Sequence, residues 1–110
     1  MKEARVKAIY IRAGKAPELI EIDNELHVLQ EKIGGYIQMV PLNENLALVC
    51  DEEGLLKGKT MNVYIGPTSF HGEMNICGDV LIVGTEEDEI ISIDQWDLIF
   101  AGLSLKLYRR

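Results

Sequence analysis

The segment from Gly34 to Gly54 constrains the fold of this chain more than any other part of the sequence. It contains two apolar runs, residues 36–42 and 46–50, each as long as a β-strand and rich in residues that suit a pleated sheet. Residues 41–45 are mostly turn formers, so the two runs are predicted to pair as a β-hairpin. Because both runs are almost continuously apolar, we expect a central pair of strands covered on both faces.

Two further strands are predicted before this hairpin. Residues 5–11 alternate imperfectly between apolar and polar side chains, which is typical of a strand. A turn that contains glycine and proline follows, and residues 18–22 form a short second strand. If these two strands pair in antiparallel fashion, the acids Glu18 and Glu21 lie near the bases of the first strand.

A helix is predicted between the second strand and the hairpin. Asp23 and Asn24 are its candidate N-caps, since their side chains can accept hydrogen bonds from the free amides of a first turn. The helix covers residues 25–32 and ends at Gly34, because glycine adopts the left-handed conformation of a C-cap at little cost. Its apolar face is expected to hold three residues at helical spacing: Leu26, Leu29 and Ile33.

The second half of the chain has a less regular pattern. Short strands are predicted at three places, residues 55–56, 76–84 and 90–91, and residues 61–73 are predicted to be mostly loop with a short element at residues 62–65. The strand at residues 76–84 contains a bend at Gly78-Asp79, and residues 105–110 are predicted to form a short strand or tail. Ser92 followed by Gln95 fits a capping box, which predicts a second helix over residues 93–103 with four packing side chains: Trp96, Ile99, Phe100 and Leu103.

These elements together predict the fold class. We expect a single compact α+β domain over residues 1–110. Its mixed, mainly antiparallel sheet would contain about six short strands, open or curled into a partial barrel. Two helices would pack against that sheet.

The charge of the chain bears on its partners and its location. Residues 1–16 hold five bases and one acid and residues 106–110 three bases, whereas residues 17–105 hold 17 acids and three bases. This acidic body argues against direct nucleic-acid binding, which needs cations to neutralise phosphates, and favours a cationic partner. The chain has neither an apolar run of about 20 residues nor a signal segment, so a cytoplasmic protein outside the membrane is expected.

No pattern in the sequence indicates catalysis, a metal or a cofactor. The run GLLKGKT at residues 54–60 has one residue too few between its glycines for a phosphate-binding loop, and we interpret it as a turn. Cys50 and Cys77 lie in apolar runs, which argues against a nucleophile paired with His27 or His71. The acidic runs lack the alternating ligand spacing of a calcium loop. We therefore predict a protein that is not an enzyme.

The region of residues 62–75 is the best candidate for a ligand or partner site. It is rich in glycine and polar side chains, and binding residues are often found on long loops of small domains. The candidate site residues are Asn62, Thr68, Ser69, His71 and Asn75. The alternative interpretation is a plain surface connection.

Several motifs follow one another in the order and spacing of a known protein family. They are Ile22-Asp23-Asn24-Glu25-Leu26, Ile33-Gly34-Gly35-Tyr36-Ile37, Leu46-Ala47-Leu48-Val49, Asp51-Glu52-Glu53-Gly54 and Gly78-Asp79-Val80-Leu81-Ile82-Val83-Gly84. Over roughly residues 5–103 the chain resembles the family Domain of Unknown Function 3846. The resemblance implies a compact α+β protein of a phage, plasmid or other mobile element. It implies no activity and no functional residue.

Three functions are compatible with these observations. The leading hypothesis is a non-enzymatic accessory protein of a mobile element that binds another macromolecule, most simply a protein. The second is an acidic inhibitor of a host defence system, with carboxylates spaced like the phosphates of DNA. The third is a small-ligand binder that uses the loop at residues 62–75. A homodimer formed through exposed strand edges is compatible with all three.

Overall fold

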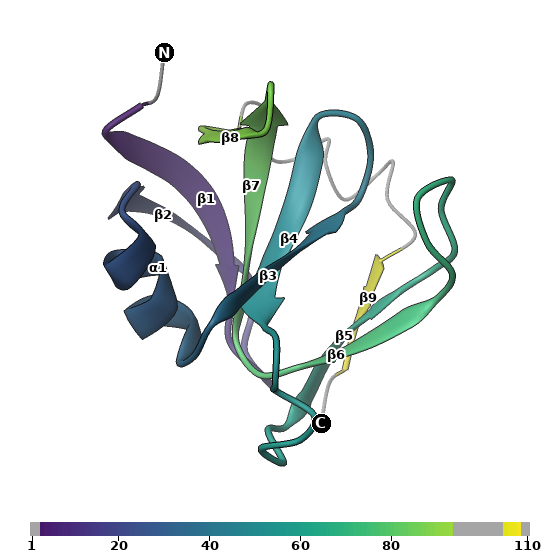
Figure 1. Ribbon diagram of the computed structural model, residues 1–110. Helices are drawn as coiled ribbons and strands as arrows, with labels where there is room; N and C mark the ends of the chain where they lie inside the picture. The colour runs from purple at the N-terminus through teal and green to yellow at the C-terminus, as the bar shows by residue number, and fades with distance from the viewer. Residues whose placement is uncertain (1–2, 94–104, 109–110) are drawn as a thin grey trace.

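Nine strands and one short helix make up the part of the chain that the computed structural model describes, residues 3–93 and 105–108 (Figure 1). The helix α1 spans Leu26–Ile33. The strands are β1 (Arg5–Ile11), β2 (Glu18–Asp23), β3 (Ile37–Pro41), β4 (Leu46–Asp51), β5 (Met61–Ile65), β6 (Met74–Cys77), β7 (Val80–Glu86), β8 (Glu89–Ile91) and β9 (Leu105–Leu107). The predicted first two strands, the β3–β4 hairpin and the first helix are confirmed.

The strands form two sheets. The larger sheet has the order β2-β1-β7-β4-β3, and β8 pairs with the far end of β7. The smaller sheet has the order β6-β5-β9. Every pair in both sheets is antiparallel. In Figure 1, α1 lies on one side of the larger sheet and the smaller sheet lies on the other.

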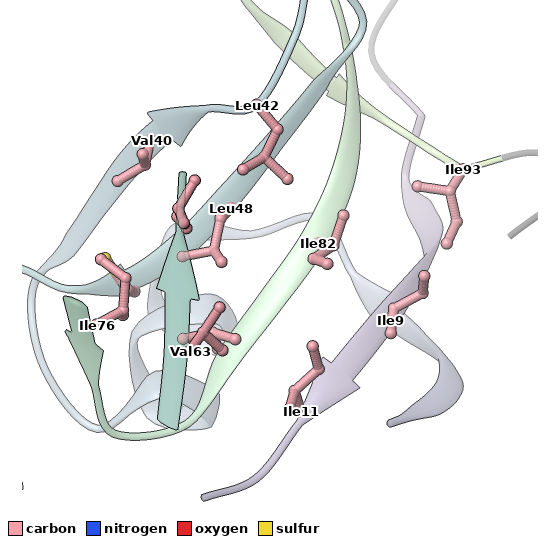
Figure 2. Packing of buried hydrophobic residues seen from close by; sticks show 12 residues of the cluster. Ile9, Ile11, Val40, Leu42, Leu48, Val63, Ile76, Ile82 and Ile93 are labelled. Atoms are coloured by element: carbon pink, nitrogen blue, oxygen red, sulfur yellow. The ribbon is translucent and has the colours of Figure 1, made fainter. Parts of the chain in front are cut away.

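The larger sheet is therefore buried on both faces, and β7 illustrates the alternation. Leu81 and Val83 belong to the core beneath α1, together with Leu29 of the helix. Val80 and Ile82 belong to the core between the two sheets, which Figure 2 shows from close by. The doubly covered pair is β4 and β7, whereas β3, with one buried residue among five, is an edge strand.

The predicted α+β fold with one mixed sheet and two packed helices is wrong. The described residues form a mostly β structure with two antiparallel sheets, and the eight residues of α1 are their one α-helix. The run at residues 76–84 is not one bent strand, because Gly78 adopts a φ of 91° and the chain passes there from β6 to β7 in the other sheet. The predicted helix at residues 93–103 lies outside the described residues apart from the buried Ile93.

Two local predictions are also wrong. Leu55 and Leu56 lie in a turn, 77% and 84% exposed, rather than in a strand. Asn24 does not cap α1, which begins after Glu25 without a side-chain cap. The Asn24 amide is instead buried and donates to the main-chain carbonyls of Glu3 and Ile90. These two hydrogen bonds join segments that are distant in sequence. No helix within residues 3–93 and 105–108 has the length and apolar character needed to cross a membrane.

Candidate functional site

The structure separates the five candidate site residues that the sequence indicates. Asn62 is buried in β5 and Asn75 is exposed in β6, where its side-chain oxygen accepts a hydrogen bond from Tyr108. Thr68, Ser69 and His71 lie between them in the connection of residues 66–73. The five side chains thus do not converge on one pocket, and their role in binding stays a prediction.

Asn62 has a structural position. Its side-chain amide donates to the carbonyls of Ile11 and Gly78 at 2.9 Å each, which ties β5 to β1 and to the β6–β7 bend.

We expect Asn62→Ala to lower the free energy of unfolding by about 2 kcal/mol, because two buried carbonyls lose their donor. Urea unfolding measures this, with Asn75→Ala as the exposed control, expected within about 0.5 kcal/mol of the parent. Equal losses for the two variants would contradict the structural role.

The connection of residues 66–73 is ordered by its own hydrogen bonds and by β3. The Thr68 hydroxyl accepts from the amides of Phe70 and His71 at 3.0 and 3.3 Å. The Nε2 atom of His71 lies 2.8 Å from the Pro41 carbonyl oxygen of β3. These contacts hold Phe70 at the β3 edge with half of its surface exposed.

A hollow of about 480 Å³ lies beside Phe70 and crosses the end of the larger sheet, on the face that α1 covers elsewhere. Its floor is apolar and includes Met39, Pro41 and Ala47. Three acids line it, Glu44 from the β3–β4 turn and Glu87-Asp88 from the β7–β8 turn, and both turns lie at the top of Figure 1. No lysine or arginine of the described residues lines this hollow, which we call the acidic groove.

The backbone of the β7–β8 turn is unusual for its sequence. Glu87 and Asp88 have φ angles of 51° and 66°, between the paired residues Glu86 and Glu89. A two-residue turn of this kind favours asparagine and glycine, because other side chains are strained at positive φ. Strained residues are commonly retained at functional sites. The turn thus gives up stability and places two carboxylates at the acidic groove.

A second charged cluster lies at the opposite end of β4. The side chain of Asp51 is fully buried, and its Oδ2 atom lies 2.6 Å from the Lys59 ammonium and 2.9 Å from that of Lys57. Both lysines also donate to the Gly34 carbonyl at the end of α1, where a cation is favourable. We call this cluster the lysine clamp. Its lysines are engaged inside the protein, which supports the interpretation of residues 54–60 as a turn.

The electrostatics of the lysine clamp hold Asp51 in its charged form. Burial alone would raise the pKa of this carboxyl, but hydrogen bonds from Lys59, Lys57 and the Glu53 amide outweigh it. The pKa falls from its ordinary 3.8 to about 2. Asp51 is therefore an ionised structural acid at neutral pH and is poorly suited to carry a proton in catalysis.

The two cysteines are also poorly placed for catalysis. Cys50 and Cys77 are free and buried. Burial, with a contribution from Asp51, raises the pKa of the Cys50 thiol to about 11, so the reactive thiolate is scarce at neutral pH. Within residues 3–93 and 105–108, no three histidine, cysteine, aspartate or glutamate side chains gather as metal ligands. The acidic groove is thus the best candidate site in the described structure.

Little in the sequence indicates this site. Its lining comes from three segments, 39–47, residue 70 and 85–88, which are brought together by strand order. Only Phe70 belongs to the region predicted at residues 62–75. The one local signal was the acidic run at residues 86–89, which has the same appearance as an ordinary solvated turn.

Comparison with known proteins adds a family assignment. A family model described as "Domain of unknown function (DUF3846)" matches residues 6–103. No curated protein and no solved structure matches the chain. The matched residues include the whole acidic groove and the whole lysine clamp.

Proposed function

Because this chain belongs to the DUF3846 family, a domain of unknown function, we propose its role from the structure: a non-enzymatic module that binds a basic protein segment in the acidic groove. One observation carries the proposal. Three carboxylates stand over an apolar floor, and no base of the described chain lies among them. The accessory role in a phage or plasmid belongs to the same proposal and rests on the family resemblance.

The chemistry of the acidic groove fits lysine and arginine side chains. Such side chains have long apolar stems that cover apolar surface while their charged ends remain beside carboxylates or water. Met39, Pro41 and Phe70 offer the apolar contact, and the acids at the rim offer the charge. Opposite charges also accelerate the encounter of two proteins.

The distribution of acids supports this function over mimicry of DNA. Glu21 and Asp23 of β2 form ion pairs with Arg5, and Glu18 forms one with Arg12. Much of the negative charge along β2 is thereby balanced within the protein. The acids of the groove instead form a compact cluster beside an apolar floor, which suits a peptide better than an extended duplex.

A small ligand held by residues 62–75 has less support. The Thr68 hydroxyl accepts hydrogen bonds from amides within the connection, and the His71 ring contacts the Pro41 carbonyl. Asn62 is buried, and its side-chain nitrogen already donates to two main-chain carbonyls. Phe70 is the residue of this region that faces the groove, and it offers apolar contact rather than polar recognition.

The test of the proposed function is binding of an eight-residue fluorescent peptide of alternating lysine and valine, measured by anisotropy at low salt. We expect the triple variant Glu44→Gln, Glu87→Gln, Asp88→Asn to bind it about tenfold more weakly, because three opposite charges are removed. The control is Glu18→Gln, Glu21→Gln, Asp23→Asn, which removes the same charge from β2. Equal loss in both variants would mean that only net charge matters, and the groove proposal would then be wrong.

The strained turn gives an opposing pair of expectations for one variant. Replacing Glu87-Asp88 by Asn-Gly should raise the free energy of unfolding by about 1 kcal/mol, because both residues then suit positive φ. The same variant should bind the lysine-valine peptide less well, since it lacks two rim carboxylates. Urea unfolding and anisotropy measure the two effects. A variant that gains stability and keeps full affinity would show that the turn plays no part in binding.

A further inference from the structure

The outer edge of β3 is open beside the acidic groove. β3 is the last strand of the larger sheet, and no described strand pairs with its outer side. The Glu52 amide donates to the Tyr36 carbonyl, and the Leu42 amide donates to the Leu46 carbonyl, so these positions face β4. Because bonding alternates along an antiparallel pair, the main-chain groups of Ile37, Met39 and Pro41 point away from β4.

One end of this edge is closed, and within residues 3–93 and 105–108 no strand pairs with the rest. Pro41 has no amide hydrogen, and its carbonyl oxygen lies 2.8 Å from His71 Nε2. Proline and a covering loop are common protections of an exposed strand edge. Ile37 and Met39 still present two amide donors and two carbonyl acceptors outward. The open part is thus short and its register is limited by Pro41.

The surroundings of the open edge are apolar in the centre and acidic at the end beside the groove. Tyr36 is 67%, Met39 38% and Phe70 51% exposed. Beyond Met39 lie the acids of the groove, whereas beyond Tyr36 the exposed Glu52 and Glu53 are accompanied by Lys57 of the lysine clamp. The other outer strand, β2, differs, because its acids are paired with Arg5 and Arg12.

From these observations we propose that the partner segment binds as an added β-strand on the outer edge of β3. The proposal rests on the proposed function and names the form of its partner: an extended peptide with basic side chains at alternate positions. Its main chain pairs with Ile37 and Met39, as in other cases of strand addition. Its basic side chains lie on the α1 side of the sheet, next to Met39 and the acidic groove.

The geometry specifies which peptide amides take part. In an antiparallel pair, each hydrogen-bonded residue exchanges both of its main-chain bonds with the residue directly opposite, and the two side chains point to the same face. Ile37 packs with the core beneath α1, and Met39 lies two residues further on the same face. The peptide residues that donate to β3 are therefore those whose side chains lie on the groove side. In the lysine-valine peptide these are the lysines.

The decisive experiment methylates peptide amides and leaves the protein unchanged. We compare the parent peptide with one N-methylated at every lysine and one N-methylated at every valine, using the native chain. The lysine-methylated peptide is expected to bind about tenfold more weakly, and the valine-methylated peptide about as well as the parent. If only the valine-methylated peptide binds more weakly, the strand adds in parallel orientation, which also supports the proposal. If both methylated peptides bind as well as the parent, or both lose the same affinity, the proposal is overturned.

A protein variant locates the edge. Met39→Pro removes an outward amide while keeping the bonds between β3 and β4, and it should weaken the parent peptide about tenfold. Leu19→Pro is the matched control, because Leu19 occupies the equivalent outward position on β2. Circular dichroism verifies that both variants fold, and the methylated peptides decide the matter if either does not. If the peptide's affinity depends on the acids of the groove but is the same for both methylated peptides, the proposed function stands and strand addition is wrong.

Discussion

Replacing Asp51 by asparagine is expected to lower the free energy of unfolding at pH 7 by about 3 kcal/mol, because it removes the anion of a buried ion-pair cluster. The substitution keeps the shape of the side chain and removes its charge. Lys57 and Lys59 would remain beside a neutral amide and the carbonyls of α1. Their side chains are 40% and 24% exposed, so water would relieve part of the loss.

The pH dependence of stability gives an independent measure of the same interaction. The folded pKa of Asp51, about 2, lies below its ordinary value of 3.8. A lowered pKa means that the stabilisation is fully present above about pH 5 and is lost as the pH falls from about 5 toward 2. The difference corresponds to about 2 kcal/mol of stability. In the Asp51→Asn variant this part of the acid sensitivity should be absent.

Urea unfolding of the two proteins between pH 2 and pH 7 tests both statements. The curves of stability against pH should converge near pH 2, where the parent carboxyl is losing its charge. Glu52→Gln is the control, since it neutralises an exposed acid next in sequence and should change stability by less than about 0.5 kcal/mol. Parallel curves, separated equally at all pH values, would show that Asp51 contributes through packing rather than charge.

Replacing Gly54 by alanine is expected to lower the free energy of unfolding by about 3 kcal/mol, since the added carbon meets fixed backbone. A Cβ atom at Gly54 would lie 2.6 Å from the carbonyl oxygen of Cys77. The chain cannot shift easily here, because the Gly54 amide donates to Asp51 and the Gly54 carbonyl accepts from the Lys59 amide. The turn of residues 52–59 and the end of β6 would have to separate.

Gly72→Ala is the matched control for this effect. A Cβ atom there meets nothing within 4 Å, and no positive φ requires glycine. Its stability should stay within about 0.5 kcal/mol of the parent, or rise slightly through reduced freedom of the unfolded chain. Urea midpoints compare the two variants. If Gly54→Ala were as stable as Gly72→Ala, the close packing of the turn on Cys77 would be wrong.

These substitutions also separate stability from binding. Asp51 and Gly54 lie at the end of β4 opposite to the acidic groove, and neither lines it. Variants that remain folded should therefore bind the lysine-valine peptide with nearly the parent affinity. The triple variant Glu44→Gln, Glu87→Gln, Asp88→Asn should show the reverse: weaker peptide binding with nearly the parent stability.

Much of the local structure could be predicted from the sequence. Alternating or continuous apolar runs with turn formers between them identified β1, β2 and the β3–β4 hairpin. The sequence predicts that α1 ends at Gly34, and the φ of 84° at this residue confirms the reason. These features depend on backbone preferences and side-chain periodicity within a few neighbouring residues, so the sequence alone determines them.

Long-range contacts decided the rest. Gly78 redirects the chain from one sheet to the other, and no local pattern distinguishes that turn from a bend within one strand. The Asn24 side chain donates hydrogen bonds to the carbonyls of Glu3 and Ile90 and does not cap the helix beside it. Residues distant in sequence are adjacent only after the strands have paired.

The candidate site belongs almost entirely to this second group. Glu44, Phe70 and Asp88 come from three separate connections and meet because β3, β4 and β7 are neighbours in the larger sheet. The sequence determined that the chain carries many acids and a buried hairpin. Only the tertiary structure determined which acids lie beside an apolar floor with no described base among them, and which strand edge pairs with no described strand, because both depend on the order in which strands pair.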